Sequence, residues 1–271
     1  MKYTNLPVCH PLGAQNVLFR ERLFEIDAQI ESGAIHEHGN DMVEAGWVAL
    51  ELATQVDDKT LKHAYIDKSE ARFNSVIDSH TSSRDVDLRF ASYHGRLGLI
   101  ALNYLQSNVE SATYDTPSLY NEVSERLRHD YFLTTSATRE RAGLMSEIVI
   151  GTIISNLLIP TIPASPRHDR PGSGIASNYA TDLYIWKDFD SPFESPPLAN
   201  IQVKSNSRSK HTKRRHYDDS ITTVCADKLP LTIYDTSKLY GDMFNGDNLS
   251  EHRLHTITKS GLSVVEQLVT K

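Results

Sequence analysis

The sequence predicts a two-part α/β protein, α+β in the wider sense, in which an all-helical N-terminal domain precedes a domain of strands and helices. From Asn16 to about Gln106, apolar residues recur at every third or fourth position, which is the period of amphipathic helices. After Pro160 the apolar period changes to two in several short runs, as in β-strands. Since a helix, several strands and a closing helix follow one another in this second half, we expect an α/β arrangement of layers there.

The helical part is expected to contain four or five short helices. Turn-forming and polar residues at Ser32-Gly33, Asp57-Asp58 and 79–83 should separate them. The apolar positions that define the helical faces are Phe19, Leu23, Ile26, Ile30, Val43, Trp47, Leu50, Leu61, Tyr65, Leu97, Ala101 and Tyr104. The polar stretch 107–118 has a proline near its end, and we place a boundary there between a helical domain 1–117 and a second domain 118–271.

The second part should begin with a short helix near 118–130, followed by the strongest helical pattern of the chain at 137–158, which Pro160 ends. Because the second half of that helix is almost entirely apolar, we expect it to be buried. Strand-like runs and a closing helix follow: TDLYIW at 181–186, ANIQVK at 199–204, ITTVCA at 221–226, a run at 231–234, and a helix at about 260–269.

The composition is that of a soluble globular protein, since 39% of the 271 residues are hydrophobic and 23% are charged. The longest nearly apolar run, 148–159, contains polar residues and is shorter than the roughly 20 residues that cross a bilayer, so we expect no membrane span. Cys9 and Cys225 form no paired spacing, and no apolar signal core follows the first residues. These features indicate a reducing, cytoplasmic environment.

The net charge of −7 argues against a nucleic-acid partner until it is divided along the chain. Residues 1–135 carry 12 basic and 20 acidic side chains, a net charge of −8, whereas residues 136–271 carry 16 and 15, a net charge of +1. The segment 204–216, KSNSRSKHTKRRH, contains six Lys or Arg and no acid. Such a run is either a solvated loop or a surface for a phosphate backbone. Its candidate contacts are Arg208, Lys210, Lys213, Arg214 and Arg215.

Glu147 is the only acidic residue between Arg141 and Leu158, within the helix that we expect to be buried. A carboxylate costs free energy to bury unless it binds something. Its neighbours four positions away on either side are Gly143 and Gly151, which would let another backbone or a ligand approach the same helix face. The alternative is an ordinary acidic residue on the helix surface.

Three polar residues fall on the first two predicted strands of the second part. Alternation places Asp182 on the face opposite Leu183, and it places Gln202 and Lys204 together on one face of the next strand. If the two strands pair as a hairpin, a carboxylate, an amide oxygen and an ammonium group meet near their ends. The alternative is a polar strand face turned to solvent.

The order of Glu on a helix, Asp on a strand and Gln-x-Lys on the next strand resembles the PD-(D/E)XK nuclease superfamily, in its QxK variant. The match covers about residues 141–205 by motif. It departs from the pattern because Thr181, not proline, precedes Asp182. A second acid-x-Lys triplet, Asp57-Asp58-Lys59, lies between predicted helices with no apolar strand before it, and we reject it on that context.

The resemblance implies a restriction-endonuclease-like core, with a central mixed sheet flanked by helices. It also implies that Glu147, Asp182 and Gln202 bind Mg²⁺, for which Mn²⁺ may substitute, and that Lys204 is the catalytic lysine. Carboxylate and amide oxygens suit Mg²⁺, and a divalent cation supplies both a nucleophile and charge compensation for phosphodiester hydrolysis.

The expected function is therefore that of a metal-dependent endonuclease acting on double-stranded DNA, such as a type II restriction or phage-defence enzyme. One site per chain would favour a homodimer for cutting both strands, and the acidic helical domain would serve in dimerisation, partner binding or target recognition. The alternative from another class is a non-catalytic interaction or regulatory protein with a degenerate nuclease-like domain.

Overall fold

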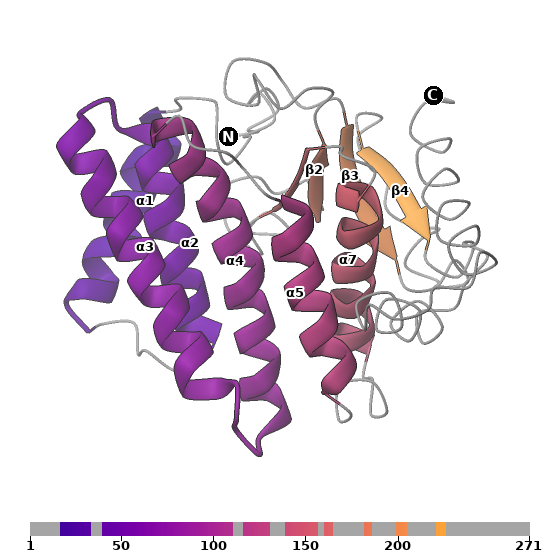
Figure 1. Cartoon of the computed structure of the whole chain (residues 1–271). Helices are drawn as coiled ribbons and strands as arrows, with labels where there is room; N and C mark the ends of the chain where they lie inside the picture. The colour runs from indigo at the N-terminus through magenta and orange to yellow at the C-terminus, as the bar shows by residue number, and fades with distance from the viewer. Residues whose placement is uncertain are drawn as a thin grey trace, which may run out of the picture. The chain divides into compact units, whose positions relative to one another are not determined.

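A computed structural model describes residues 17–33, 40–110, 116–130, 139–156, 160–164, 182–185, 199–204 and 221–225 (Figure 1). These residues are mostly helical and include a small mixed β-sheet, and they fall into two compact units. The first unit contains the helices α1 (Val17–Glu31), α2 (Asn40–Gln55), α3 (Lys59–His80) and α4 (Val86–Glu110). The second contains α5 (Thr116–His129), α7 (Arg139–Asn156), β1 (Thr161–Pro163), β2 (Leu183–Ile185), β3 (Ala199–Lys204) and β4 (Ile221–Cys225).

The helices of the first unit end where the sequence predicts separators. Gly33 follows α1 with a φ of 71°, a left-handed conformation that glycine adopts without steric cost. Asp58 caps α3, because its side chain accepts a hydrogen bond of 2.8 Å from the backbone N–H of Leu61. This cap gives the rejected triplet at 57–59 a structural role.

The polar stretch 107–118, in which the domain boundary is expected, contains the end of α4 at Glu110 and the start of α5 at Thr116. Two expectations about this unit need correction. Two of its helices are long, since α3 has 22 residues and α4 has 25. The buried face of α3 is also not the predicted one. Leu61 is 41% exposed, and the buried residues of α3 are Ile66, Ser69, Phe73, Val76 and Ile77.

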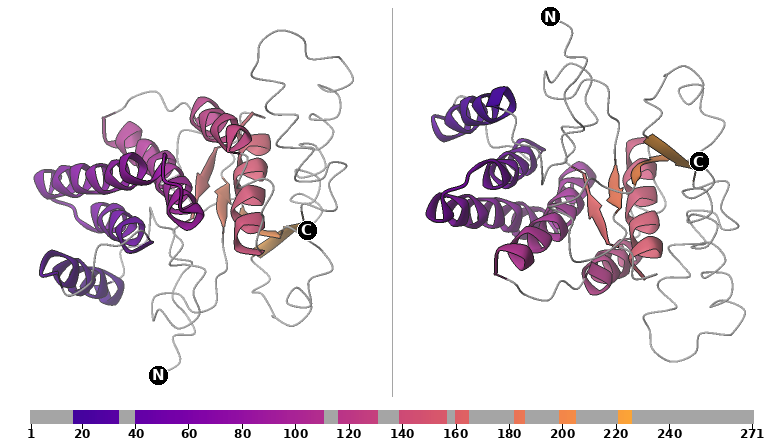
Figure 2. Two further views of the ribbon diagram at one scale, coloured as in Figure 1. Left: turned by 90° about the horizontal axis from the view of Figure 1, so that it is seen from below. Right: turned by 90° about the horizontal axis from the view of Figure 1, so that it is seen from above.

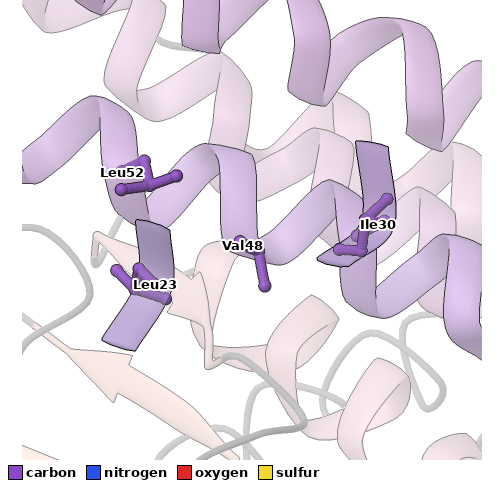
Figure 3. Close-up of a cluster of buried hydrophobic side chains, with 5 residues drawn as sticks. Leu23, Ile30, Val48 and Leu52 are labelled. Atoms are coloured by element: carbon purple, nitrogen blue, oxygen red, sulfur yellow. The ribbon is translucent and has the colours of Figure 1, made fainter. Parts of the chain in front are cut away.

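Helix α1 packs on α2 through an apolar cluster, four of whose members are labelled in Figure 3. Leu23 and Ile30 of α1 lie two turns apart and are buried against α2, as the period of the sequence predicts. Tyr65 of α3 covers the edge of this cluster. The remaining members are Ala45, Val48 and Leu52 of α2.

Phe73 fills the space between α3 and its two neighbours, α2 and α4. Its side chain is fully buried, and its ring meets that of Trp47 edge to face with centroids 5.7 Å apart. Glycines on both neighbours make room for it: an ideal Cβ at Gly46 would lie 2.6 Å from Phe73 Cδ1, and one at Gly98 would lie 2.7 Å from Phe73 Cε2. These distances are too short for a real Cβ, so the two glycines allow the three helices to approach around one aromatic ring.

Four charged side chains join α1 to α3 at the edge of this unit. Asp27, whose side chain is 10% exposed, accepts hydrogen bonds from Lys68 at 2.8 Å and from Arg72 at 3.2 Å. Both cations also contact Glu31, at 2.7 and 2.8 Å. Arg72 in addition donates to the carbonyl oxygen of Ala45 at 2.9 Å, so α2 is included in the network. Burial, and then the Asp27 carboxylate, raise the pKa of the neighbouring Tyr65 phenol.

We expect Arg72→Ala to lower the free energy of unfolding by about 1–3 kcal/mol, because it removes a donor from the buried Asp27 carboxylate and from the Ala45 carbonyl. Glu31→Ala is the matched control on the same network. The Glu31 side chain is 57% exposed, so its loss should cost no more than about 1 kcal/mol, and less in high salt. Urea denaturation measures the free energy of unfolding of both variants. Equal losses would show that the buried contacts of Arg72 with Asp27 and Ala45 add no stability beyond the exposed contact with Glu31.

The second unit contains a four-stranded sheet in the order β1-β2-β3-β4 among the described residues. The β1/β2 and β2/β3 pairs are antiparallel and the β3/β4 pair is parallel, so the sheet is mixed. Helix α7 contacts β1 and β3, and α5 packs against α7, as Figure 2 shows from two directions. The strands β2, β3 and β4 lie within the predicted runs 181–186, 199–204 and 221–226.

Strand β1 was not predicted, because it has only three residues, follows Pro160, which was interpreted as the end of a helix, and itself ends in Pro163. The predicted strand at 231–234 and the closing helix at 260–269 lie outside the described residues. The helix expected at 137–158 is α7, and its residues 144–146 and 148–155 are buried. No helix in the described ranges combines the length and the apolar character needed to cross a membrane.

Candidate functional site

Asp182 lies immediately before β2 and is hydrogen-bonded to β3 through both its backbone and its side chain. Its N–H donates to the carbonyl oxygen of Ile201 at 2.8 Å. Its carboxylate oxygen Oδ2 accepts a hydrogen bond from the backbone N–H of Val203 at 2.5 Å. Val203 stands between Gln202 and Lys204 in the sequence, so the carboxyl group of Asp182 is fixed at the part of β3 that carries both residues.

The contact with Ile201 departs from regular strand pairing. Ile201 is the register partner of Leu183, and it also accepts the N–H of Asp182. Two consecutive residues therefore face one, as in a β-bulge, which redirects a side chain relative to strict alternation. Asp182 is half-buried, whereas Leu183 and Ile185 are fully buried. The prediction that Asp182 simply occupies the opposite strand face omits this bulge.

Strand β3 presents two faces of different character. Ile201 and Val203 are buried, and Gln202 and Lys204 alternate with them along the backbone, so these two share the other face. In the parallel pair with β4, Gln202 is opposite Thr223 and Lys204 is opposite Cys225. The backbone thus brings Gln202 and Lys204 to one sheet face beside Asp182.

Glu147 lies in the middle of α7 and is half-buried, in a helix whose neighbouring positions are buried. The two glycines at its side differ. The space over Gly151 is filled by the ring of Tyr120 of α5, whereas a Cβ at Gly143 would meet no atom of the described residues within 4 Å. Close approach to the helix at Gly151 is therefore explained by an aromatic side chain of this unit.

The predicted metal ligands stay a prediction. Among the residues that the structure describes, no three His, Cys, Asp or Glu side chains form a group that could hold a metal ion. The predicted set contains two such side chains, Glu147 and Asp182, with the amide oxygen of Gln202 as the third ligand. A carboxylate has about four acceptor sites, so the bond from Val203 is compatible with metal binding by Asp182.

The predicted phosphate-binding segment begins within the described part of the chain and continues outside it. Lys204 ends β3, and its backbone is paired with β4. The five candidate phosphate contacts lie outside the described residues: Arg208, Lys210, Lys213, Arg214 and Arg215. Lys204 is the first residue of this segment. It directly follows Val203, whose backbone N–H donates a hydrogen bond to Asp182.

Sequence reasoning missed the residues of α5 that contact α7. Tyr120 and Ser124 are buried, and Ser124 is hydrogen-bonded to Thr152 of α7. Their partners lie about 30 positions away in the sequence, so no local spacing links them. The available signal in the sequence was the presence of Thr152 and Ser155 within the nearly apolar run 148–159, because buried polar groups require partners.

Comparison with protein-family models, curated proteins and solved structures finds no match to this chain.

Proposed function

We propose that the chain is a Mg²⁺-dependent endonuclease that hydrolyses phosphodiester bonds of double-stranded DNA, and that its second unit has a restriction-endonuclease-like core. The observation that carries this proposal is the hydrogen bond from the Val203 N–H to the Asp182 carboxylate. It places a carboxyl group at the Gln-x-Lys stretch of β3. The mixed sheet, and the contact of the preceding helix α7 with β1 and β3, give further support.

Each residue has a distinct role in this proposal. Asp182 is the central metal ligand, Glu147 is the acidic ligand from α7, and Gln202 contributes an amide oxygen. These oxygen donors suit Mg²⁺, with Mn²⁺ as a substitute, and a bound cation would supply a hydroxide-like nucleophile and compensate phosphate charge. With one neutral ligand, the protein contributes two negative charges to the cation.

Lys204 would orient the attacking water and stabilise the charge that develops on the phosphoryl oxygens. Water adds to phosphorus and one P–O bond to deoxyribose breaks, which yields a phosphate monoester and an alcohol. The basic segment after Lys204 would hold the DNA backbone. Because residues 1–114, which contain the four helices of the first unit, carry 10 basic and 16 acidic side chains, a net charge of −6, we assign this unit to dimerisation or target recognition and not to broad phosphate contact.

The direct test is incubation of the purified protein with supercoiled plasmid, with Mg²⁺ or with chelator. Wild-type protein should nick or linearise the plasmid only when Mg²⁺ or Mn²⁺ is present. We expect Lys204→Ala to lower the cleavage rate about a hundredfold or more, because it removes a cation from the developing phosphoryl charge.

Lys59→Ala is the matched control, because Lys59 ends the other acid-x-Lys triplet and begins α3. It should cut like the wild type. Equal cleavage rates for wild type and Lys204→Ala would point to a contaminating nuclease. A wild-type protein that binds DNA but leaves it intact would favour the non-catalytic interaction protein.

A further inference from the structure

The helix that carries Glu147 is joined to α5 by a chain of buried hydroxyl groups. Ser124 Oγ and Thr152 Oγ1 lie 2.7 Å apart, and Thr152 Oγ1 also donates to the carbonyl oxygen of Ile148 at 2.6 Å. A hydroxyl group has a single proton, so Ser124 must donate to Thr152 when Thr152 donates to Ile148. Ile148 directly follows Glu147. The chain of hydrogen bonds therefore ends one residue from the proposed ligand.

A pair of amide side chains fixes the same two helices one turn further along. Asn156 Nδ2 donates to Asn121 Oδ1 at 2.8 Å, and Asn121 Nδ2 donates in return at 3.4 Å. Asn156 also donates to the carbonyl oxygen of Thr152 at 2.8 Å. Directional bonds at two successive turns of α7 restrict both its rotation about its axis and its sliding along α5.

An aromatic contact sets the separation of the helices. Tyr120 is fully buried, and its ring lies over Gly151, one turn after Glu147. An ideal Cβ at Gly151 would lie 2.7 Å from Tyr120 Cζ, so a methyl group there must displace the ring or the helix. At Gly143, one turn before Glu147, no atom in the described part of the chain lies within 4 Å of such a Cβ. The two glycines thus offer opposite environments at equal sequence distance from the same carboxylate.

We infer that Tyr120, Asn121 and Ser124 are positioning residues for the proposed metal site. They fix the rotation of α7 about its own axis and its position along α5, and so they fix where α7 lies against the sheet. Helix α7 contacts β1 and β3, and Asp182 is bonded to β3. A shift of α7 therefore moves Glu147 relative to Asp182. This inference rests on the proposed function and adds to it a requirement for α5.

The closing experiment compares Gly151→Ala with Gly143→Ala. Gly151→Ala should raise the Mg²⁺ concentration for half-maximal cleavage and lower the rate, each by about tenfold or more, because small misplacements of catalytic groups are costly. Gly143→Ala should remain within about twofold of wild type on both measures, because its methyl group would contact none of the residues that the structure describes. Circular dichroism should show both variants folded at the assay temperature.

Two further comparisons separate positioning from loss of stability. Thr152→Val removes the hydroxyl and should raise the Mg²⁺ requirement, whereas Thr152→Ser retains the hydroxyl and should behave like wild type. Tyr120→Leu combined with Gly151→Ala should recover activity lost in Gly151→Ala, since the smaller side chain leaves room for the methyl group. If Gly151→Ala only lowers the melting temperature and leaves the Mg²⁺ dependence unchanged, the inference is wrong.

Failure of the proposed function is recognised separately. If the wild type does not cut DNA with either cation, that function is wrong, and the ¹³C resonance of the Glu147 carboxyl group decides the inference about α5. The resonance is identified by its absence in Glu147→Gln. Gly151→Ala should shift it, and the added Tyr120→Leu change should return it toward the wild-type position. An unmoved resonance overturns the inference.

Discussion

Asp182→Asn should lower Mg²⁺-dependent cleavage by about a thousandfold and leave the protein folded. The reason is the hydrogen bond between the Asp182 carboxylate and the Val203 N–H. An asparagine oxygen can accept the same bond, so the contact with β3 is retained. The amide lacks the negative charge that a Mg²⁺ ligand supplies, so the chemistry is lost.

Asp182→Ala removes both the charge and the acceptor, and it should therefore lose stability as well as activity. The backbone N–H of Val203 then lacks its hydrogen-bond acceptor, which should lower the free energy of unfolding by about 1–3 kcal/mol. Thermal unfolding and plasmid cleavage, measured on the two variants in parallel, separate the structural role from the chemical one. We expect equal loss of cleavage in both and a lower melting temperature only in Asp182→Ala.

Asp58→Asn is the control for both measurements. Asp58 is also an aspartate that accepts a backbone N–H, from Leu61 at the start of α3, and asparagine caps a helix about as well. Its activity and melting temperature should match those of the wild type. An Asp182→Asn protein that cuts at the wild-type rate would remove Asp182 from the metal site. One that fails to fold would show that an asparagine oxygen does not replace the carboxylate as the acceptor of the Val203 N–H.

The sequence specified local features of this fold better than the faces of its helices. Asp58 and Gly33 end or begin helices through contacts within three residues, and both separators were predicted. The face of α3 was not, because Leu61 lies in its first turn and is 41% exposed, whereas the buried stripe begins at Ile66. Helical period shows that a helix has a buried face but does not show where along the helix the neighbours begin.

The candidate site shows the same division between local and distant information. The alternation of Gln202 and Lys204 follows from strand geometry, and β3 has the predicted bounds. The bulge at Asp182 and the bond from Val203 depend on pairing across 21 residues, which alternation within one strand does not describe. The contact of Tyr120 with Gly151 joins two helices, and a glycine alone does not indicate what fills the space over it.

Phe73→Ala should destabilise the first unit by about 3–5 kcal/mol, which is a large share of the 5–15 kcal/mol that typically separates folded from unfolded protein. The ring is fully buried, and the two glycines that face it, Gly46 of α2 and Gly98 of α4, carry no side chains that could move into the cavity. Phe24→Ala is the matched control, because Phe24 is 36% exposed on α1. Its loss should cost about 1 kcal/mol or less. Urea denaturation compares the two, and similar losses would contradict a central role for Phe73.

Gly98→Ala tests the same contact from the opposite side. The informative quantity is the sign of the change in the free energy of unfolding. Helix propensity alone would make alanine more stable than glycine by about 1 kcal/mol. A Cβ at Gly98 would lie 2.7 Å from Phe73 Cε2, however, and overpacking of this kind costs about 1–3 kcal/mol. A net loss of stability therefore means that the contact outweighs propensity. Phe73→Leu should recover part of that loss when it is combined with Gly98→Ala, because leucine leaves space for the added methyl group between α3 and α4.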